Sequence, residues 1–332
     1  MSSPTMPPSG PTDGPDETAP DRVIDRTADR EPSASGPADR PGVGGAVAAD
    51  PTIPSAGPPA DAPPAWVTRV ADRLAAWPPL RQAEREARIW VRTWKGAAVN
   101  GLLTPLLFLG AMGLGLGGLI DDNAGGRSVD GLTYLTFVTP GILAAAALQS
   151  AAGDALWPVM SGIKWTKTFH AAAATPLGPG DVLGGYLLWS AARLTLNSVA
   201  FLAIAAVLGG VPSWWGLLAI PAAVAGGMAL SAPLAAYTSR QDSDLSFPII
   251  MRIVVMPMFL FSGTFFAVDQ LPAVLRPVAW VTPLFHAVEL CRGFTTGQVD
   301  ALAVVGHTAF LAACIAGGWW LGAREFARRL GS

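Results

Sequence analysis

Lysine, cysteine and charged side chains in general are scarce in this chain. Of its 332 residues 14% are charged and 51% are hydrophobic, and the mean hydropathy is +0.40. These values exclude an ordinary soluble protein. Only three lysines occur and none follows a glycine. The chain therefore lacks the Gly-Lys-Ser/Thr end of a phosphate-binding P-loop, and we expect no ATP hydrolysis by that route.

Other absences narrow the function further. Cys291 and Cys314 lie in apolar stretches without a metal-ligand or redox spacing, so we expect no metal site and no disulfide. The basic residues are scattered along the chain instead of forming a patch, which argues against nucleic-acid binding. No apolar stretch lies near the first residue, so we expect no cleaved signal peptide.

Residues 1–65 contain almost no large apolar side chain. They are rich in Pro, Gly, Ala, Ser, Thr and Asp, and they carry ten acidic and four basic residues. Such a segment cannot bury enough surface to offset its ordering entropy, so we predict a disordered cytoplasmic tail. We interpret it as a solvated extension, with a docking or regulatory role as the alternative.

Residues 66–96 are predicted to form an amphipathic helical region at the membrane interface. Apolar residues first recur at helical spacing, and a cationic stretch with tryptophans follows. The residues concerned are Trp66, Val70, Leu74, Trp77, Arg81, Arg85, Arg88, Trp90, Arg92, Trp94 and Lys95. Tryptophan and long cationic side chains favour the interface. A solvated helix leading into the first membrane span is the alternative.

Six apolar stretches have the length of about twenty residues that a bilayer core requires. They lie at residues 97–119, 134–157, 182–208, 214–238, 247–268 and 301–323. Gly113 and Gly117 offer a small-residue surface for close helix packing, and glycines that only reflect a GC-rich coding bias are the alternative. With the N-terminus inside, fourteen Lys and Arg residues flank the inner ends and three lie outside. We therefore predict an all-α polytopic membrane protein with six transmembrane helices and both termini in the cytoplasm.

Residues 256–297 do not leave the membrane as a polar loop. Pro272, Pro277 and Pro283 interrupt a segment that otherwise stays apolar, and prolines at that density exclude one straight helix. We predict a broken, re-entrant outer element between helices 5 and 6, packed against protein.

The run LPAVLRPVAWVTPLFHAVELCRG, preceded by FSGTFF, carries Leu271-Pro272, Pro283-Leu284, His286 and Arg292 in order. This ordered set resembles the signature region of the type-2 ATP-binding-cassette (ABC) export permeases. It is most similar to the nodulation-factor (NodJ-like) and daunorubicin-resistance-like branches. The resemblance covers roughly residues 90–330, so the N-terminal tail lies outside it.

The resemblance implies that residues 97–332 are the transmembrane domain of an ATP-driven exporter in a bacterial plasma membrane. Such a chain is no enzyme itself and binds no cofactor, because a separate cytoplasmic ABC ATPase holds ATP and Mg. It would work as a homodimer or with a similar permease. The cargo would be amphipathic, a drug, a lipid or a glycolipid, and the sequence does not choose among them.

The connection between the second and third spans is predicted to hold a helix over residues 163–174, closed by Pro176. Lys164, Lys167 and His170 would then share one face. The resemblance implies that this connection is a coupling helix seated in the ATPase. The matching residues are Lys164, Trp165, Lys167, Thr168, His170, Thr175 and Pro176. A cationic loop that only sets the topology is the alternative.

Two further groups of residues are candidates for a role in transport. The resemblance assigns Pro272, Pro283, His286, Glu289 and Arg292 to an outer gate. Glu289 and Arg292 are spaced to pair with each other, and a local salt bridge without a transport role is the alternative. Within the spans, Arg193 and Asn197 lie one turn apart, with Asp154 and Gln149 as candidate partners. These polar groups must face protein or water, and they either contact cargo or hold helices together.

Two rival functions remain open from the sequence. An intramembrane serine protease would use Ser262 with His286 or His307, although Leu260 stands where its motif requires glycine. An ion-coupled secondary transporter would need carboxylates near the middle of the membrane. Only Asp154 lies within a predicted span, and it lies near one end.

Overall fold

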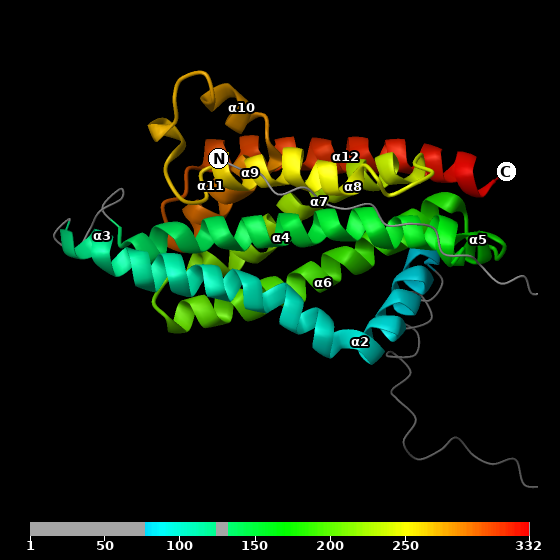
Figure 1. Ribbon diagram of the computed structural model, residues 1–332, viewed down its shortest axis with the longest axis horizontal. Helices are drawn as coiled ribbons and strands as arrows, with labels where there is room; N and C mark the ends of the chain where they lie inside the picture. The colour runs from blue at the N-terminus through cyan, green and yellow to red at the C-terminus, as the bar shows by residue number, and fades with distance from the viewer. Residues whose placement is uncertain (1–76, 124–131, 332) are drawn as a thin grey trace, which may run out of the picture. The chain divides into compact units, whose positions relative to one another are not determined.

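A computed structural model describes residues 77–123 and 132–331 of the chain, and its elements in these two ranges are helices (Figure 1). The predicted tail and the first part of the predicted interfacial region lie outside the described residues. The first half contains α2 (Pro78–Phe108), η1 (Leu109–Leu116), α3 (Gly117–Asn123), α4 (Tyr134–Met160), η2 (Ser161–Trp165), α5 (Thr168–Ala173) and α6 (Pro179–Val207). The second half contains η3 (Trp214–Leu218), α7 (Ala219–Ser239), α8 (Phe247–Ile250), η4 (Met251–Val255), α9 (Met256–Phe261), η5 (Val268–Gln270), α10 (Arg276–Trp280), α11 (Pro283–Thr296) and α12 (Ala301–Leu330).

Five helices in the described ranges are long and apolar enough to cross a membrane. They are Trp94–Ile120, Tyr134–Trp165, Pro179–Val207, Trp214–Ser239 and Ala301–Leu330. The predicted span at residues 247–268 is shorter than expected, because its apolar helix covers only Phe247–Phe261. The backbone leaves the helix at Ser262, and Gly263 follows at a positive φ of 82°. A count of six crossings therefore stays a prediction.

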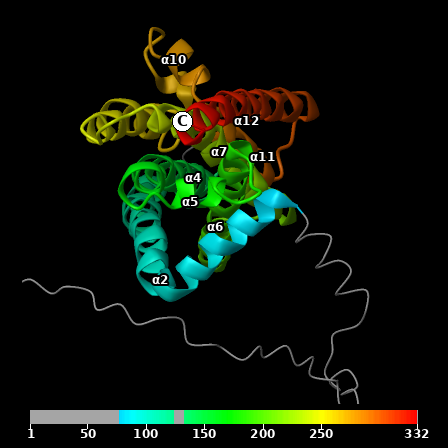
Figure 2. The same cartoon turned by 90° about the vertical axis from the view of Figure 1, so that its right-hand side faces the viewer.

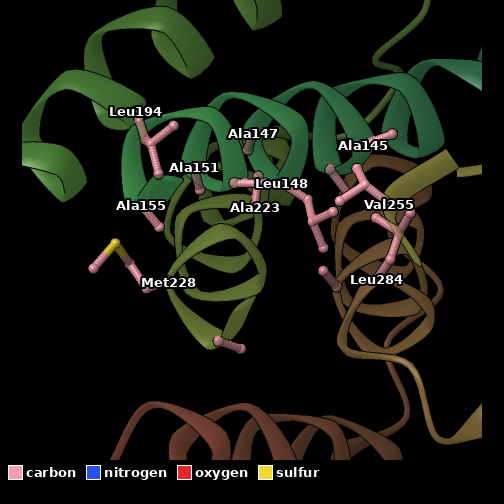
Figure 3. Close-up of a cluster of buried hydrophobic side chains, with 14 of the residues drawn as sticks. Ala145, Ala147, Leu148, Ala151, Ala155, Leu194, Ala223, Met228, Val255 and Leu284 are labelled. Atoms are coloured by element: carbon pink, nitrogen blue, oxygen red, sulfur yellow. The ribbon is translucent and has the colours of Figure 1, made fainter. Parts of the chain in front are cut away.

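The most enclosed helix is α4. Alanines on α4 face α7 and α11, and this small-residue packing lets the helices approach closely (Figure 3). A Cβ atom added to Gly227 of α7 would lie 3.1 Å from the carbonyl oxygen of Ala147. Because lipid offers no hydrophobic driving force between helices, such close backbone contact is the expected source of packing energy.

The first described helix, α2, packs against α6. Its first part turns away from the direction of the following span (Figures 1 and 2). Gln82 is only 1% exposed, and Trp90 packs edge-to-face on Trp189 with ring centroids 5.8 Å apart. A Cβ atom at Gly185 of α6 would lie 2.2 Å from the carbonyl oxygen of Pro79. One face of the predicted amphipathic helix is therefore covered by protein.

The two glycines singled out in the first span lie against the start of α4. A Cβ atom at Gly113 would lie 2.5 Å from Cδ1 of Leu135, and one at Gly117 would lie 3.4 Å from Cδ1 of Tyr134. The predicted close packing at this small-residue surface is confirmed.

Candidate functional site

The connection between α4 and α6 is not a single helix. The π-helix η2 prolongs α4 to Trp165, and α5 begins only at Thr168. Between them Lys167 adopts the left-handed conformation, with φ 52° and ψ 25°. The predicted helix over residues 163–174 is therefore wrong, because a left-handed residue interrupts the helical course. The predicted common face of Lys164, Lys167 and His170 is wrong for the same reason.

The connection nevertheless presents an exposed surface. Lys164, Trp165, Lys167, Thr175 and Pro176 are exposed, and Thr168 and His170 are half-buried. Trp165 keeps 54% of its surface exposed. The residues that sequence analysis assigned to ATPase coupling are thus accessible to a partner, and their role stays a prediction.

Phe169 fixes this connection to the rest of the protein, and sequence analysis missed it. Its side chain is 2% exposed. The ring packs against Tyr186 of α6 and Phe326 of α12, with centroids 5.6 and 5.8 Å away. A Cβ atom at Gly162 would lie 2.7 Å from the Phe169 ring. The signal in the sequence was a large apolar side chain among the small and polar residues at 166–176.

A second link joins the connection to α12 through the turn between α7 and α8. The Lys164 ammonium donates to the carbonyl oxygen of Asp242. The Asp242 carboxylate accepts from Arg329 Nη2 at 2.6 Å, and this hydrogen bond holds the pKa of Asp242 below its ordinary value. Arg240 and Glu325 form a neighbouring pair at 2.6 Å. Three segments distant in sequence therefore meet at this end of the helices.

The four polar residues predicted within the spans line one cavity. Gln149, Asp154, Arg193 and Asn197 all contribute to its wall, and its volume is about 580 Å³. The cavity lies between α2, α4, α6 and η4.

An ion pair closes one side of this cavity. Arg193 Nη2 pairs with the carboxylate of Asp154, which also accepts from Ser190 Oγ at 3.2 Å. The Tyr186 hydroxyl donates to the backbone carbonyl of Asp154 at 2.8 Å. Of the two partners proposed for Arg193, the structure therefore selects Asp154. Whether the pair contacts cargo or only holds α4 to α6 stays a prediction.

The predicted outer element is built around Arg292. The Thr282 hydroxyl accepts from Phe285 N at 3.3 Å and so caps α11, with Pro283 in its first turn, where a missing N–H costs nothing. Arg292 donates from Nη1 to Glu289 at 2.7 Å and from Nη2 to the carbonyl oxygen of Gly263 at 2.6 Å. The predicted Glu289–Arg292 contact is confirmed.

Arg292 also reaches α4, since its guanidinium lies 4.2 Å from the ring centroid of Phe137. Glu289 and Arg292 line a second cavity of about 390 Å³. Of the other predicted gate residues, Pro272 is exposed and Pro283 is half-buried. A gating role for these residues stays a prediction.

His286 contacts His307 of α12, a pairing that sequence analysis did not anticipate. The two Nδ1 atoms lie 2.7 Å apart, and His286 Nε2 lies 2.9 Å from the carbonyl oxygen of Trp280. Since a carbonyl only accepts, Nε2 of neutral His286 carries the proton and His307 Nδ1 donates to His286. The Ser262 hydroxyl instead contacts Thr282 at 2.9 Å. The geometry thus does not assemble the Ser–His pair of a serine nucleophile.

The amino-acid sequence matches one protein family and several relatives. The ABC-2 type transporter family profile matches residues 83–294. Nodulation protein J of Rhizobium leguminosarum bv. viciae is 31% identical over 218 residues, which cover 63% of this chain and 82% of that protein. Nodulation protein J of Rhizobium meliloti (strain 1021) is 27% identical over 226 residues, 68% of this chain and 81% of that protein.

Proposed function

The chain belongs to the ABC-2 type transporter family, and we propose that it is the permease subunit of an ATP-driven exporter. Membership of this family supports the interpretation that the chain is a multi-pass membrane component, which works with an ATPase and is not itself an enzyme. The observation that carries the proposal is the family match over residues 83–294. We further propose that it moves an amphipathic cargo, a drug, a lipid or a glycolipid, out of the cytoplasm of a bacterium.

We propose six crossings, with both termini in the cytoplasm. The helix Phe247–Phe261 would span about 22 Å at 1.5 Å per residue, less than the roughly 30 Å of a bilayer core. The following segment through α10 and α11 would therefore complete the outer part of this crossing as a re-entrant element. Its broken backbone is compatible with the membrane, because α11 packs on α4 and α7.

The proposed mechanism is mechanical. The exposed residues Lys164, Trp165 and Lys167 would contact the ATPase, which binds ATP and Mg. Movement of this surface would reach α6 and α12 through Phe169, and α12 again through Asp242 and Arg329. Two copies, or one copy with a similar permease, would enclose the path. An ion-coupled mechanism is less well supported, because the carboxylate of Asp154 is already paired with Arg193.

Reversing the charge of Lys164 and Lys167 tests this proposal. The double variant Lys164→Glu/Lys167→Glu should lower the amount of ABC ATPase that co-purifies from native membranes by at least about ten-fold, since like charges across an interface cost several kcal/mol. ATPase turnover of the purified complex should fall with it. Arg88→Glu, an exposed cation on α2 outside the connection, is the matched control and should change neither. An unchanged double variant would contradict the coupling role.

A further inference from the structure

The cavity between α2, α4, α6 and η4 carries polar groups that the fold itself does not use. Thr104, Gln149, Ser150 and Asn197 line it together with the Asp154–Arg193 pair. In the part of the chain that the structure describes, no side-chain hydrogen bond is made by these four residues. Gln149, Ser150 and Asn197 are half-buried and Thr104 is exposed, so their polar groups remain accessible from the cavity. Within a membrane such groups need water or a polar ligand as hydrogen-bond partner.

The cavity is electrically neutral. Asp154 and Arg193 are its only ionisable lining residues among those described, and they neutralise each other. A charged group that enters such a site loses its hydration and finds no free counter-charge, which is costly within a membrane. No aromatic ring lines the described wall, so recognition there depends on hydrogen bonds and not on stacking.

We infer that this cavity binds the uncharged, hydroxyl- or amide-bearing head group of an amphipathic cargo and rejects anionic and cationic head groups. Gln149 and Asn197 can both donate and accept, as such a head group requires. Pro105, Ala146 and Met251 supply an apolar part of the wall for the attached chain. The inference rests on the proposed export function and adds the charge class of the cargo to it.

Binding of three fluorescent lipids to the purified protein in detergent tests the inference. The probes carry the same acyl chains and differ in the head group: a neutral glucosyl, an anionic phosphatidylglycerol and a cationic trimethylammonium group. The wild type should bind the glucosyl lipid at least about ten-fold more tightly than either charged lipid. Equal affinity for all three would overturn the inference.

A charged side chain placed in the cavity should change the order of affinities for the three lipids. Gln149→Glu should favour the cationic lipid and Gln149→Lys the anionic lipid, each by about ten-fold relative to the wild type. Gln270→Glu, at an exposed position that lines neither of the two cavities, is the matched control and should keep the wild-type order. Asn197→Asp provides a second cavity variant if a Gln149 variant does not fold.

An unchanged order in folded Gln149 and Asn197 variants would also overturn the inference. The binding measurement needs neither ATP nor an ATPase. Its failure is therefore distinguishable from failure of the export function, which the Lys164 and Lys167 variants test separately.

Discussion

Replacing Arg193 by leucine is expected to lower the free energy of unfolding by about 3–5 kcal/mol, because it leaves the buried Asp154 carboxylate without its cation. The Asp154 side chain is only 12% exposed, and Ser190 would remain as its one side-chain hydrogen-bond donor. Unfolding of the purified protein by denaturant in detergent measures the effect.

The double variant Asp154→Leu/Arg193→Leu is the informative control. Replacing both members of a buried ion pair by apolar residues is often neutral, so its stability should lie within about 1 kcal/mol of the wild type. Additive losses in the double variant would contradict a direct pairing. If the double variant is stable but no longer binds the glucosyl lipid, the pair serves cargo binding and not only helix packing.

Replacing Gly318 by valine is expected to have the second large effect. A Cβ atom at Gly318 of α12 would lie 2.5 Å from the backbone nitrogen of Pro233 and 2.8 Å from the carbonyl carbon of Ala232, both on α7. Backbone atoms cannot move aside as a flexible side chain can, so α12 and α7 must separate. We expect a loss of about 3 kcal/mol or more in the free energy of unfolding.

The neighbouring Gly317 gives a matched control. A Cβ atom there would meet nothing within 4 Å, so Gly317→Val should stay close to the wild type in the same unfolding measurement. If the two valine variants behave alike, α12 does not pack on α7 through Gly318.

Local sequence patterns predicted the features that depend on near neighbours in the chain. Hydropathy indicated the long helices, and prolines indicated that the segment after Phe261 is broken into short helices. The i, i+3 spacing of Glu289 and Arg292 predicted a contact that the structure confirms at 2.7 Å. Each of these follows from the composition or geometry of one segment.

The errors lie where the conformation of a single residue decides the course of the backbone. Apolar sequence continues to Val268, yet the helix ends at Phe261, with Gly263 at positive φ. Lysine has a high intrinsic helix propensity, and yet Lys167 adopts the left-handed conformation that separates η2 from α5. Tertiary packing of Phe169 against α6 and α12 accompanies that break.

The sequence by itself determined that this is a helical membrane protein, and its ordered motif indicated the ABC-2 type family. Only the tertiary structure decided that Asp154 pairs with Arg193, that His286 meets His307, and that four polar residues share one cavity. Hydropathy and short spacings act within one helix, so the sequence shows them directly. Contacts between helices depend on their mutual register and rotation, which packing of the whole fold determines.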